Sequence, residues 1–316
     1  MLSQTATYWQ ANYCIKFLLF ISEIGCSISK RMEGARQAPG PACYAVTLKA
    51  SMPQRLTKFV RFSTGIGSSY GIWHNDGIQA IAGTPFMDWR PTDQWMQQDD
   101  VELLVPCHPS KILAVGRNFK SHLHGRPEPT VPEFFFKPPS ALQHPDKPIS
   151  LPLDATDVHF EGEMVLVIGQ RCRNVSEWVA LDYLLGITIG NDLSDRNWQR
   201  GEQKDLQWWR AKGCDTFAPC GPCIVAGLEP NNLLLETRVN GELQQSESTT
   251  DLIFSAARCV AFASRYLTLE PGDLIYTGTP GNTKSLKHGD VVEVFLEEVG
   301  VLRNPVRLDG SEQDKI

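Results

Sequence analysis

Glu161 and Glu163 stand two residues apart in the segment His159-Phe-Glu-Gly-Glu163, directly before the apolar run Met164 to Ile168. On an extended strand, residues two apart point to the same face, so the two carboxylates would project together. Such a pair repels strongly unless a cation neutralises it. Oxygen ligands suit Mg²⁺, Mn²⁺ or Ca²⁺ better than zinc. A solvated strand end also explains many such pairs, so the tripeptide alone leaves both interpretations open.

A third carboxylate follows the next apolar run. Leu184 to Asn191 reads as a buried strand, and Asp192 comes directly after it. A polar segment containing Gln199 follows, and then Lys212 after two tryptophans. These features are typical of a lined pocket, whereas most isolated lysines are simply solvated. The sequence therefore favours an acidic metal site beside a cavity.

Seven short stretches, singly unspecific, occur in an order that resembles the fumarylacetoacetate hydrolase family from about residue 111 to residue 306. The matching stretches are Val115-Gly-Arg-Asn-Phe-Lys-Ser-His122, Phe135-Phe-Lys-Pro-Pro-Ser140, Val158-His-Phe-Glu-Gly-Glu163, Gly190-Asn-Asp192, Arg210-Ala-Lys-Gly-Cys-Asp-Thr-Phe217, Arg238-Val-Asn-Gly-Glu242 and Gly272-Asp-Leu-Ile-Tyr-Thr-Gly-Thr-Pro280. The resemblance covers about the C-terminal two-thirds of the chain.

The resemblance implies a β-roll-like fold, commonly a homodimer, with one divalent cation, Mg²⁺ or Mn²⁺ and less readily Ca²⁺. By position it assigns the metal ligands to Glu161, Glu163 and Asp192. Lys212 would lie beside the metal and stabilise an enolate, and His122 would act as acid or base. Contacts with substrate or bound water are implied at Arg117, Lys137, Gln199 and Thr279.

Family members act on small oxo- or diketo-acids through an enolate that the metal stabilises as a Lewis acid. The leading interpretation is therefore a hydrolase or lyase, which cleaves a carbon–carbon bond in an acylpyruvate-like or fumarylacetoacetate-like acid or decarboxylates an oxaloacetate-like one. Many relatives carry a His followed three residues later by Glu, but Gly125 stands three residues after His122. Glu128 lies nearby, although Pro127 disfavours the helical register that would bring it to the histidine.

Two alternatives remain open. The missing glutamate favours an isomerase or tautomerase of the 2-hydroxyhepta-2,4-diene-1,7-dioate type on the same class of substrate. A non-catalytic protein that binds oxo-acids or metal is the other alternative. Lys212, Gln199 and Thr279 argue against it, because storage of a metal requires none of them.

The elements that must position these residues are mostly strands. Alternating or continuous apolar runs predict strands in the ranges 59–62, 70–73, 78–81, 111–115, 133–136, 163–168, 184–189, 234–239, 274–276 and 291–296. One helix is predicted from about Leu252 to Leu267, where apolar residues recur at helical spacing. Strands outnumber helices without alternating with them. We therefore expect a β-rich α+β fold, a mixed β-roll with few helices.

The chain of 316 residues predicts four parts. Residues 1–51 are expected to be an extension that is disordered or not part of the native protein, 52–107 a small β-rich N-terminal domain, 108–308 the catalytic domain, and 309–316 a tail. Nine scattered cysteines, an odd number, indicate a reducing compartment. We expect the cytoplasm, or an organelle matrix if residues 1–51 are a transit peptide.

Charge and hydropathy limit the classes of partner that this chain is expected to bind. Lys plus Arg number 30 against 36 for Asp plus Glu, a formal net charge of -6, which offers no general attraction to nucleic acid. The longest membrane-like stretch, Phe17 to Ile21, is far shorter than the roughly 20 apolar residues of a spanning helix. A small oxo-acid is the expected partner, with no nucleic acid and no membrane.

Overall fold

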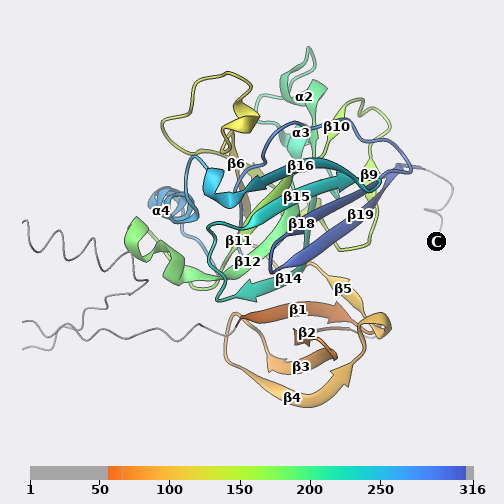
Figure 1. Cartoon of the computed structure of the whole chain (residues 1–316), viewed down its shortest axis with the longest axis vertical. Coiled ribbons are helices and arrows are strands. Elements are labelled where there is room, and N and C mark those ends of the chain that lie inside the picture. Colours follow the sequence, from red (N-terminus) through yellow and green to blue (C-terminus); the bar gives the residue numbers. More distant parts are fainter. Residues whose placement is uncertain (1–55, 66, 311–316) are drawn as a thin grey trace, which may run out of the picture. The chain divides into compact units, whose positions relative to one another are not determined.

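A computed structural model describes residues 56–65 and 67–310 of the chain. The expected extension 1–51 and residues 311–316 of the expected tail lie outside these described residues. Within them strands predominate, as expected from the sequence (Figure 1). The first five strands are β1 (Thr57–Ser63), β2 (Ser68–His74), β3 (Gly77–Gly83), β4 (Trp89–Met96) and β5 (Glu102–Leu104).

These first strands belong to a 12-stranded sheet that also contains the strands of the candidate site. Along its main path the order is β4-β3-β2-β1-β14-β12-β11-β17-β6-β7, with β5 paired to β1 and β8 paired to β14. Most neighbours run antiparallel, but β17 pairs with β6 in parallel. The strands after β5 are β6 (Ile112–Gly116), β7 (Glu133–Lys137), β8 (Leu142–Gln143), β11 (Gly162–Ile168), β12 (Leu184–Asn191), β14 (Ala218–Ala226) and β17 (Leu274–Tyr276).

A five-stranded sheet packs against this large sheet. Its order is β16-β15-β18-β19-β9, and β15 and β18 contact β11 while β18 and β19 contact β12 (Figure 1). The interface buries aliphatic side chains of both sheets, such as Met164, Ile187, Leu235 and Val294. The strands are β9 (Ile149–Leu151), β15 (Leu234–Val239), β16 (Glu242–Ser248), β18 (Val291–Leu296) and β19 (Gly300–Leu308), and β10 (Val158–His159) forms a separate ladder with β13 (Ser194–Asp195).

The helices are few and short. They are α2 (Arg196–Arg200), α3 (Trp209–Gly213) and α4 (Ala256–Tyr266), with the 3₁₀ segments η1 (Gln98–Asp100), η2 (Ser121–Leu123), η3 (Pro139–Ala141), η4 (Glu177–Tyr183) and η5 (Thr249–Asp251). None of the helices in the described residues is long and apolar enough to span a membrane.

Helix α4 begins later than the sequence predicts. The expected helix starts at about Leu252, but residues 249–251 form η5 and the α-helix starts at Ala256. Ser255 caps it, because its side-chain oxygen accepts a hydrogen bond from the backbone N–H of Arg258 at 3.2 Å. The predicted strands, in contrast, are all present, with ends that differ by at most two residues. The expected boundary at residue 107 stays a prediction.

Candidate active site

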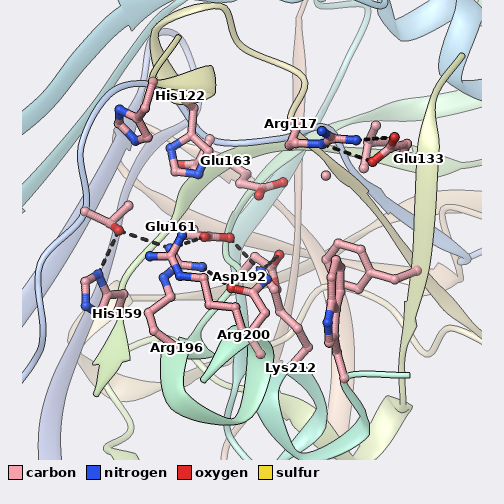
Figure 2. A pocket seen from close by; sticks show the side chains of 18 of the residues that line it. Arg117, His122, Glu133, His159, Glu161, Glu163, Asp192, Arg196, Arg200 and Lys212 are labelled. Atoms are coloured by element: carbon pink, nitrogen blue, oxygen red, sulfur yellow. Dashed lines mark hydrogen bonds and ion pairs between the residues drawn. The ribbon is translucent and has the colours of Figure 1, made fainter. Parts of the chain in front are cut away.

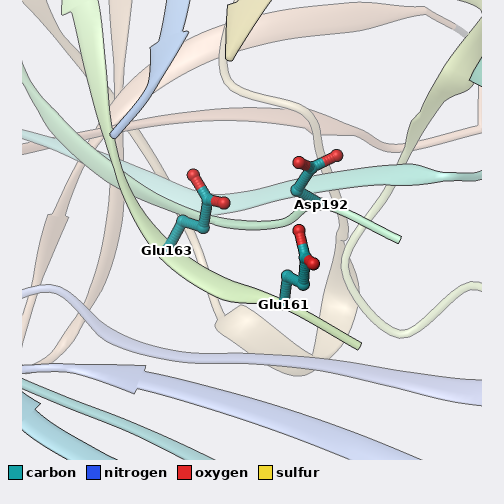
Figure 3. Close-up of side chains that lie close together, drawn as sticks. All are labelled: Glu161, Glu163 and Asp192. Atoms are coloured by element: carbon teal, nitrogen blue, oxygen red, sulfur yellow. The ribbon is translucent and has the colours of Figure 1, made fainter. Parts of the chain in front are cut away.

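Three buried carboxylates meet where β11 and β12 lie side by side. One oxygen from each of Glu161, Glu163 and Asp192 lies within 4.8 Å of the others. Figure 3 shows the three side chains gathered together. All three residues are at most 5% exposed. Three acidic groups so close in a dry environment require positive charge beside them. This is the convergence that the sequence interpretation depends on.

The strand register explains the convergence. In the antiparallel β11–β12 pair, Gly162 is opposite Asn191, so the residues just beyond them, Glu161 and Asp192, are neighbours. The Asn191 side chain accepts a hydrogen bond from the N–H of Glu161 at 2.9 Å, and the N–H of Asp192 donates to the carbonyl of Glu161 at 2.8 Å. A Cβ added at Gly162 would overlap the Thr237 hydroxyl. Glycine between the two glutamates therefore lets the second sheet approach the site.

Two lysines and an arginine supply positive charge to these carboxylates. The Lys212 ammonium donates to Glu161 Oε2 and to Asp192 Oδ2, both at 2.6 Å. Lys137 donates to the other oxygen of Asp192, Oδ1, at 2.6 Å, and its side chain is fully buried. Arg196 donates to Glu161 Oε1. Glu163 is different, because its recorded partner is the backbone N–H of Gly278, at 2.6 Å.

The pKa directions follow from these partners. Burial raises the pKa of Glu161, but the charges of Arg196 and Lys212 outweigh it and hold that pKa below its usual value. Burial, reinforced by the charges of Asp192 and Glu161, raises the pKa of Glu163 well above its usual value. The ammonium of Lys212 has a raised pKa, because Asp192 and Glu161 outweigh its burial. Of the three carboxylates, Glu163 is thus the one without an ion pair in the described part of the chain.

The donor set fits a hard divalent cation. All three groups are carboxylates, which such ions prefer, and among the described residues Glu163 has no cationic side chain bonded to it. A cation between the three carboxylates would supply the missing charge beside Glu163. The structure thus contains a buried acidic triad with the chemistry of a metal site, and the identity of the ion stays a prediction.

The triad forms part of the wall of a cavity of about 540 Å³ (Figure 2). His122 lies on its wall, and its Nδ1 is 2.7 Å from the backbone carbonyl of Gly281. A carbonyl only accepts hydrogen bonds, so Nδ1 carries the proton and Nε2 is the nitrogen that can take up another. Burial lowers the pKa of His122, which favours the neutral ring.

Comparison with known proteins places this arrangement in a family. The model of the fumarylacetoacetate (FAA) hydrolase C-terminal domain matches residues 111–307, and that of the Rv2993c-like N-terminal region matches residues 57–106. This chain belongs to the fumarylacetoacetate hydrolase family. Its strand-rich fold is the fold of that family, as expected.

Similar proteins and a similar solved structure cover most of the chain. Protein Rv2993c of Mycobacterium tuberculosis is 46% identical over 237 residues, which are 73% of this chain and 88% of that protein. The mitochondrial oxaloacetate tautomerase fahd2 of Xenopus laevis is 36% identical over 224 residues, 67% of this chain and 70% of its own. A crystal structure of 2-hydroxyhepta-2,4-diene-1,7-dioate isomerase from Mycobacterium marinum superposes with a TM-score of 0.75 at 39% identity and covers 81% of this chain and all of that one.

The structure brings together most of the residues that family resemblance singled out. The triad, Lys212 and His122 all border the cavity. Gln199 borders it too, and its side-chain oxygen accepts from Arg196 at 2.7 Å. Thr279 lines the wall with its hydroxyl already engaged, since it donates to Gly162 O at 2.9 Å and accepts from Gln245 at 2.8 Å.

Two residues that were expected to contact substrate are bonded to acidic side chains of the protein. Lys137 is paired with Asp192 and does not line the cavity, and its contact with substrate stays a prediction. Arg117 does reach the wall, but its guanidinium is paired with Glu133 through two nitrogens. Both cations therefore hold acidic side chains in this structure.

A chain of hydrogen bonds beside the triad has no counterpart among the predicted site residues. Arg196 Nη2 donates to the Thr283 hydroxyl at 3.0 Å. The same hydroxyl lies 2.8 Å from His159 Nδ1, and the other ring nitrogen of His159, Nε2, lies 2.9 Å from Asp157 Oδ1. Helix α2 positions Arg196, and Asp195 caps that helix by accepting from the N–H of Trp198. The one sign of this hydrogen-bonded chain in the sequence is Arg196, a basic residue three positions before Gln199.

Proposed function

We propose that this chain catalyses metal-dependent proton transfer next to the carbonyl of a small 2-oxo acid, as an enol–keto tautomerase or double-bond isomerase. One observation carries the proposal. His122 borders the cavity with its Nδ1 proton donated to a backbone carbonyl, and its ring makes no hydrogen bond or ion pair with a carboxylate in the described part of the chain. A neutral imidazole of this kind suits the transfer of a proton to and from carbon or oxygen.

The loop after His122 supports this choice over water activation. Gly125, at the position of the family's dyad glutamate, has a φ of +80°, a backbone conformation that L side chains rarely adopt. Glu128, the possible substitute, is ion-paired with Lys120 at 3.4 Å. A histidine without a carboxylate partner is a weaker activator of water. Hydrolysis and decarboxylation, the leading interpretation from the sequence, therefore become the second choice.

The residues around the triad suit enolate chemistry. A bound divalent cation would supply a Lewis acid that polarises the substrate carbonyl. Lys212 keeps a positive charge within the cavity wall, where it stabilises negative charge that develops on the substrate oxygen. His122 Nε2 receives and returns the proton. The names of the tautomerase from Xenopus laevis and the isomerase from Mycobacterium marinum agree with this proposal.

The experiment follows three reactions of the purified chain in parallel with Mg²⁺ or Mn²⁺. These are the loss of the enol absorbance of oxaloacetate, the release of pyruvate from oxaloacetate, and the hydrolysis of acetylpyruvate and fumarylpyruvate. We expect faster enol–keto conversion that EDTA abolishes and that His122→Asn reduces by about a hundredfold. Rapid cleavage of these acids without faster tautomerisation would overturn the proposal. Tight oxalate binding without turnover of any acid would instead indicate a binding protein.

Compartment and subunit number are part of the proposal. The tautomerase relative from Xenopus laevis is named as mitochondrial, which accords with an organelle matrix as well as with the cytoplasm. A homodimer remains our expectation, to be tested by light scattering of the purified chain.

A further inference from the structure

One side chain of the smaller sheet reaches the residues of the candidate site. Gln245 lies on β16, the edge strand of the five-stranded sheet (Figure 1), and is only 3% exposed. It pairs with Thr237 of β15, the residue whose hydroxyl a Cβ at Gly162 would overlap. The close approach of the two sheets at Gly162 therefore brings the Gln245 amide within reach of the site.

The Gln245 amide closes a cycle of hydrogen bonds. Its oxygen accepts from the N–H of Gly162 at 3.3 Å, and its nitrogen donates to the Thr279 hydroxyl at 2.8 Å. That hydroxyl donates in turn to the carbonyl of Gly162 at 2.9 Å. The amide nitrogen donates its other hydrogen to the carbonyl of Pro280. Both N–H groups and the oxygen of the amide are thus engaged.

These partners leave the amide one orientation. With its nitrogen and oxygen exchanged, the NH₂ group would meet the N–H of Gly162, and the oxygen would meet the carbonyl of Pro280. Donor would then oppose donor and acceptor would oppose acceptor in a buried environment, where unmatched polar groups are costly. Gln245 therefore holds the segment 279–280 at a fixed position beside β11.

The segment that Gln245 holds leads directly into the residue that orients His122. Gly281 follows Pro280, and its carbonyl lies 2.7 Å from His122 Nδ1. Glycine restricts its own φ and ψ less than any other residue, so contacts with other residues must fix the direction of this carbonyl. One is the hydrogen bond from the N–H of Gly281 to Ser121 Oγ at 2.8 Å. A second is the bond from Gln245 to the carbonyl of Pro280, since that carbonyl shares a planar peptide group with the Gly281 nitrogen.

We propose that Gln245 is a positioning residue, which fixes the Gly281 carbonyl through Pro280 and so holds His122 in the tautomer with the proton on Nδ1. The Nε2 atom then stays free to take a proton from the substrate. Gln245 does not line the cavity, so we assign it no contact with substrate. Its effect on turnover rests on the proposed function, whereas its effect on the His122 tautomer does not.

The test replaces Gln245 by methionine, which has a similar length and no amide. NMR of untagged protein labelled with ¹⁵N-histidine shows which ring nitrogen carries the proton, at pH 8, where the lowered pKa of His122 leaves its ring neutral. The His122 signals are identified by their absence from His122→Asn. We expect the Nδ1–H tautomer in the wild-type chain. In Gln245→Met we expect a mixture with the Nε2–H tautomer, because the Gly281 carbonyl is no longer fixed.

Turnover distinguishes positioning from general damage to the fold. With Mg²⁺, Gln245→Met should reduce kcat for the enol–keto conversion of oxaloacetate by about tenfold, because part of the His122 population has its proton on the wrong nitrogen. KM and the calorimetric affinity for Mg²⁺ should keep their wild-type values, since the triad and Lys212 are unchanged. In a His122→Asn background the same substitution should cause no further loss of kcat.

Gln244→Met is the matched control. Gln244 precedes Gln245 on β16, is half-buried, and its amide donates to the backbone carbonyl of Glu242 at 3.2 Å, outside the cycle. We expect the wild-type tautomer, kcat and KM in this variant. Gln245→Asn is a second probe and should shift the tautomer as Gln245→Met does, because the shorter amide no longer reaches the carbonyl of Pro280.

The outcomes separate the two proposals. A wild-type His122 with its proton on Nε2 would overturn the inference about Gln245, and so would an unchanged tautomer in whichever of the two Gln245 variants folds. A further loss of kcat in the His122→Asn background would also overturn it, because Gln245 would then act independently of His122. A shifted tautomer with wild-type kcat would support the inference and count against the part of His122 in the proposed function. A wild-type chain that converts none of the oxo-acids would count against the proposed function, while the NMR result would still decide the inference.

Discussion

Lys212 links two of the three carboxylates, and its side chain is only 2% exposed. Replacement by methionine keeps most of the length of the side chain and removes the charge. We expect Lys212→Met to reduce kcat by about a hundredfold or more, because one charge that stabilises the developing enolate is lost. Calorimetric titration with Mn²⁺ should still saturate, since the three carboxylates remain. A variant with wild-type turnover would contradict a role for Lys212 in the reaction.

Glu163 offers a sharper test of the metal site. Its raised pKa favours the neutral form of the carboxyl group when no metal is bound, and glutamine imitates that form. We expect Glu163→Gln to weaken Mg²⁺ or Mn²⁺ binding by about tenfold or more, because one charged ligand is lost. The thermal midpoint of the metal-free protein should barely change. Equal metal affinity in the variant and the wild type would rule out Glu163 as a ligand.

At this scale the sequence predicted the acidic residues better than their partners. Spacing and resemblance identified the triad, but nothing near residue 137 indicates that Lys137 lies behind Asp192. That contact joins residues 55 positions apart and depends on the packing of β7 beside β6. Contacts of this kind arise only when the strands have assembled.

At the scale of elements, Gly162 determines how closely the two sheets approach. A methyl group there would overlap the Thr237 hydroxyl and also come within 3.0 Å of Val294. We expect Gly162→Ala to lower the free energy of unfolding by about 1–3 kcal/mol and to weaken metal binding, because both neighbouring glutamates shift. Urea unfolding and metal titration measure the two effects.

The matched control is Thr237→Ala, which enlarges the space beside residue 162. Thr237 Oγ1 is buried and has no hydrogen-bond partner among the described residues, so Thr237→Ala removes the overlapping atom at little cost. Combined with Gly162→Ala, it should restore part of the lost stability and affinity. Strictly additive losses in the double variant would show that this overlap is not the cause.

Strands could be predicted and the short helices could not. Runs such as Met164 to Ile168 carry their own hydrophobic signal. Helices α2 and α3 have five residues each, too few for a helical period to be recognised, although α2 carries Arg196 and Gln199 and α3 carries Lys212. The late start of α4 follows from the Ser255 cap, which the apolar spacing does not reveal.

At the scale of the whole molecule, the fold buries five of the six cysteines among the described residues. Burial raises the pKa of Cys220, Cys223 and Cys259 to about 12. We expect iodoacetamide at pH 8 to leave these three unmodified in the folded protein and to modify them in urea, as peptide mass mapping would show. Modification of all three under native conditions would contradict the structure.

The same thiols predict a pH dependence. The folded state keeps protons that the unfolded chain releases above its ordinary thiol pKa of about 9. The contribution of these cysteines to stability is therefore complete below about pH 9 and decreases as the pH rises toward 12. Urea unfolding at a series of pH values, compared with a Cys220→Ala variant, measures this decrease.

The pairing of β1 with β14 has a consequence for solubility. At one end of β14, residues 224–226 pair antiparallel with Thr57, Lys58 and Phe59 of β1. On its other side β14 adjoins β12 of the candidate site. Without the first five strands, these apolar residues of β14 would form an open strand edge, and open edges pair with strands from other molecules. The first five strands thus cover an edge of the sheet, and we expect a chain that lacks residues 57–106 to be less soluble than the full chain.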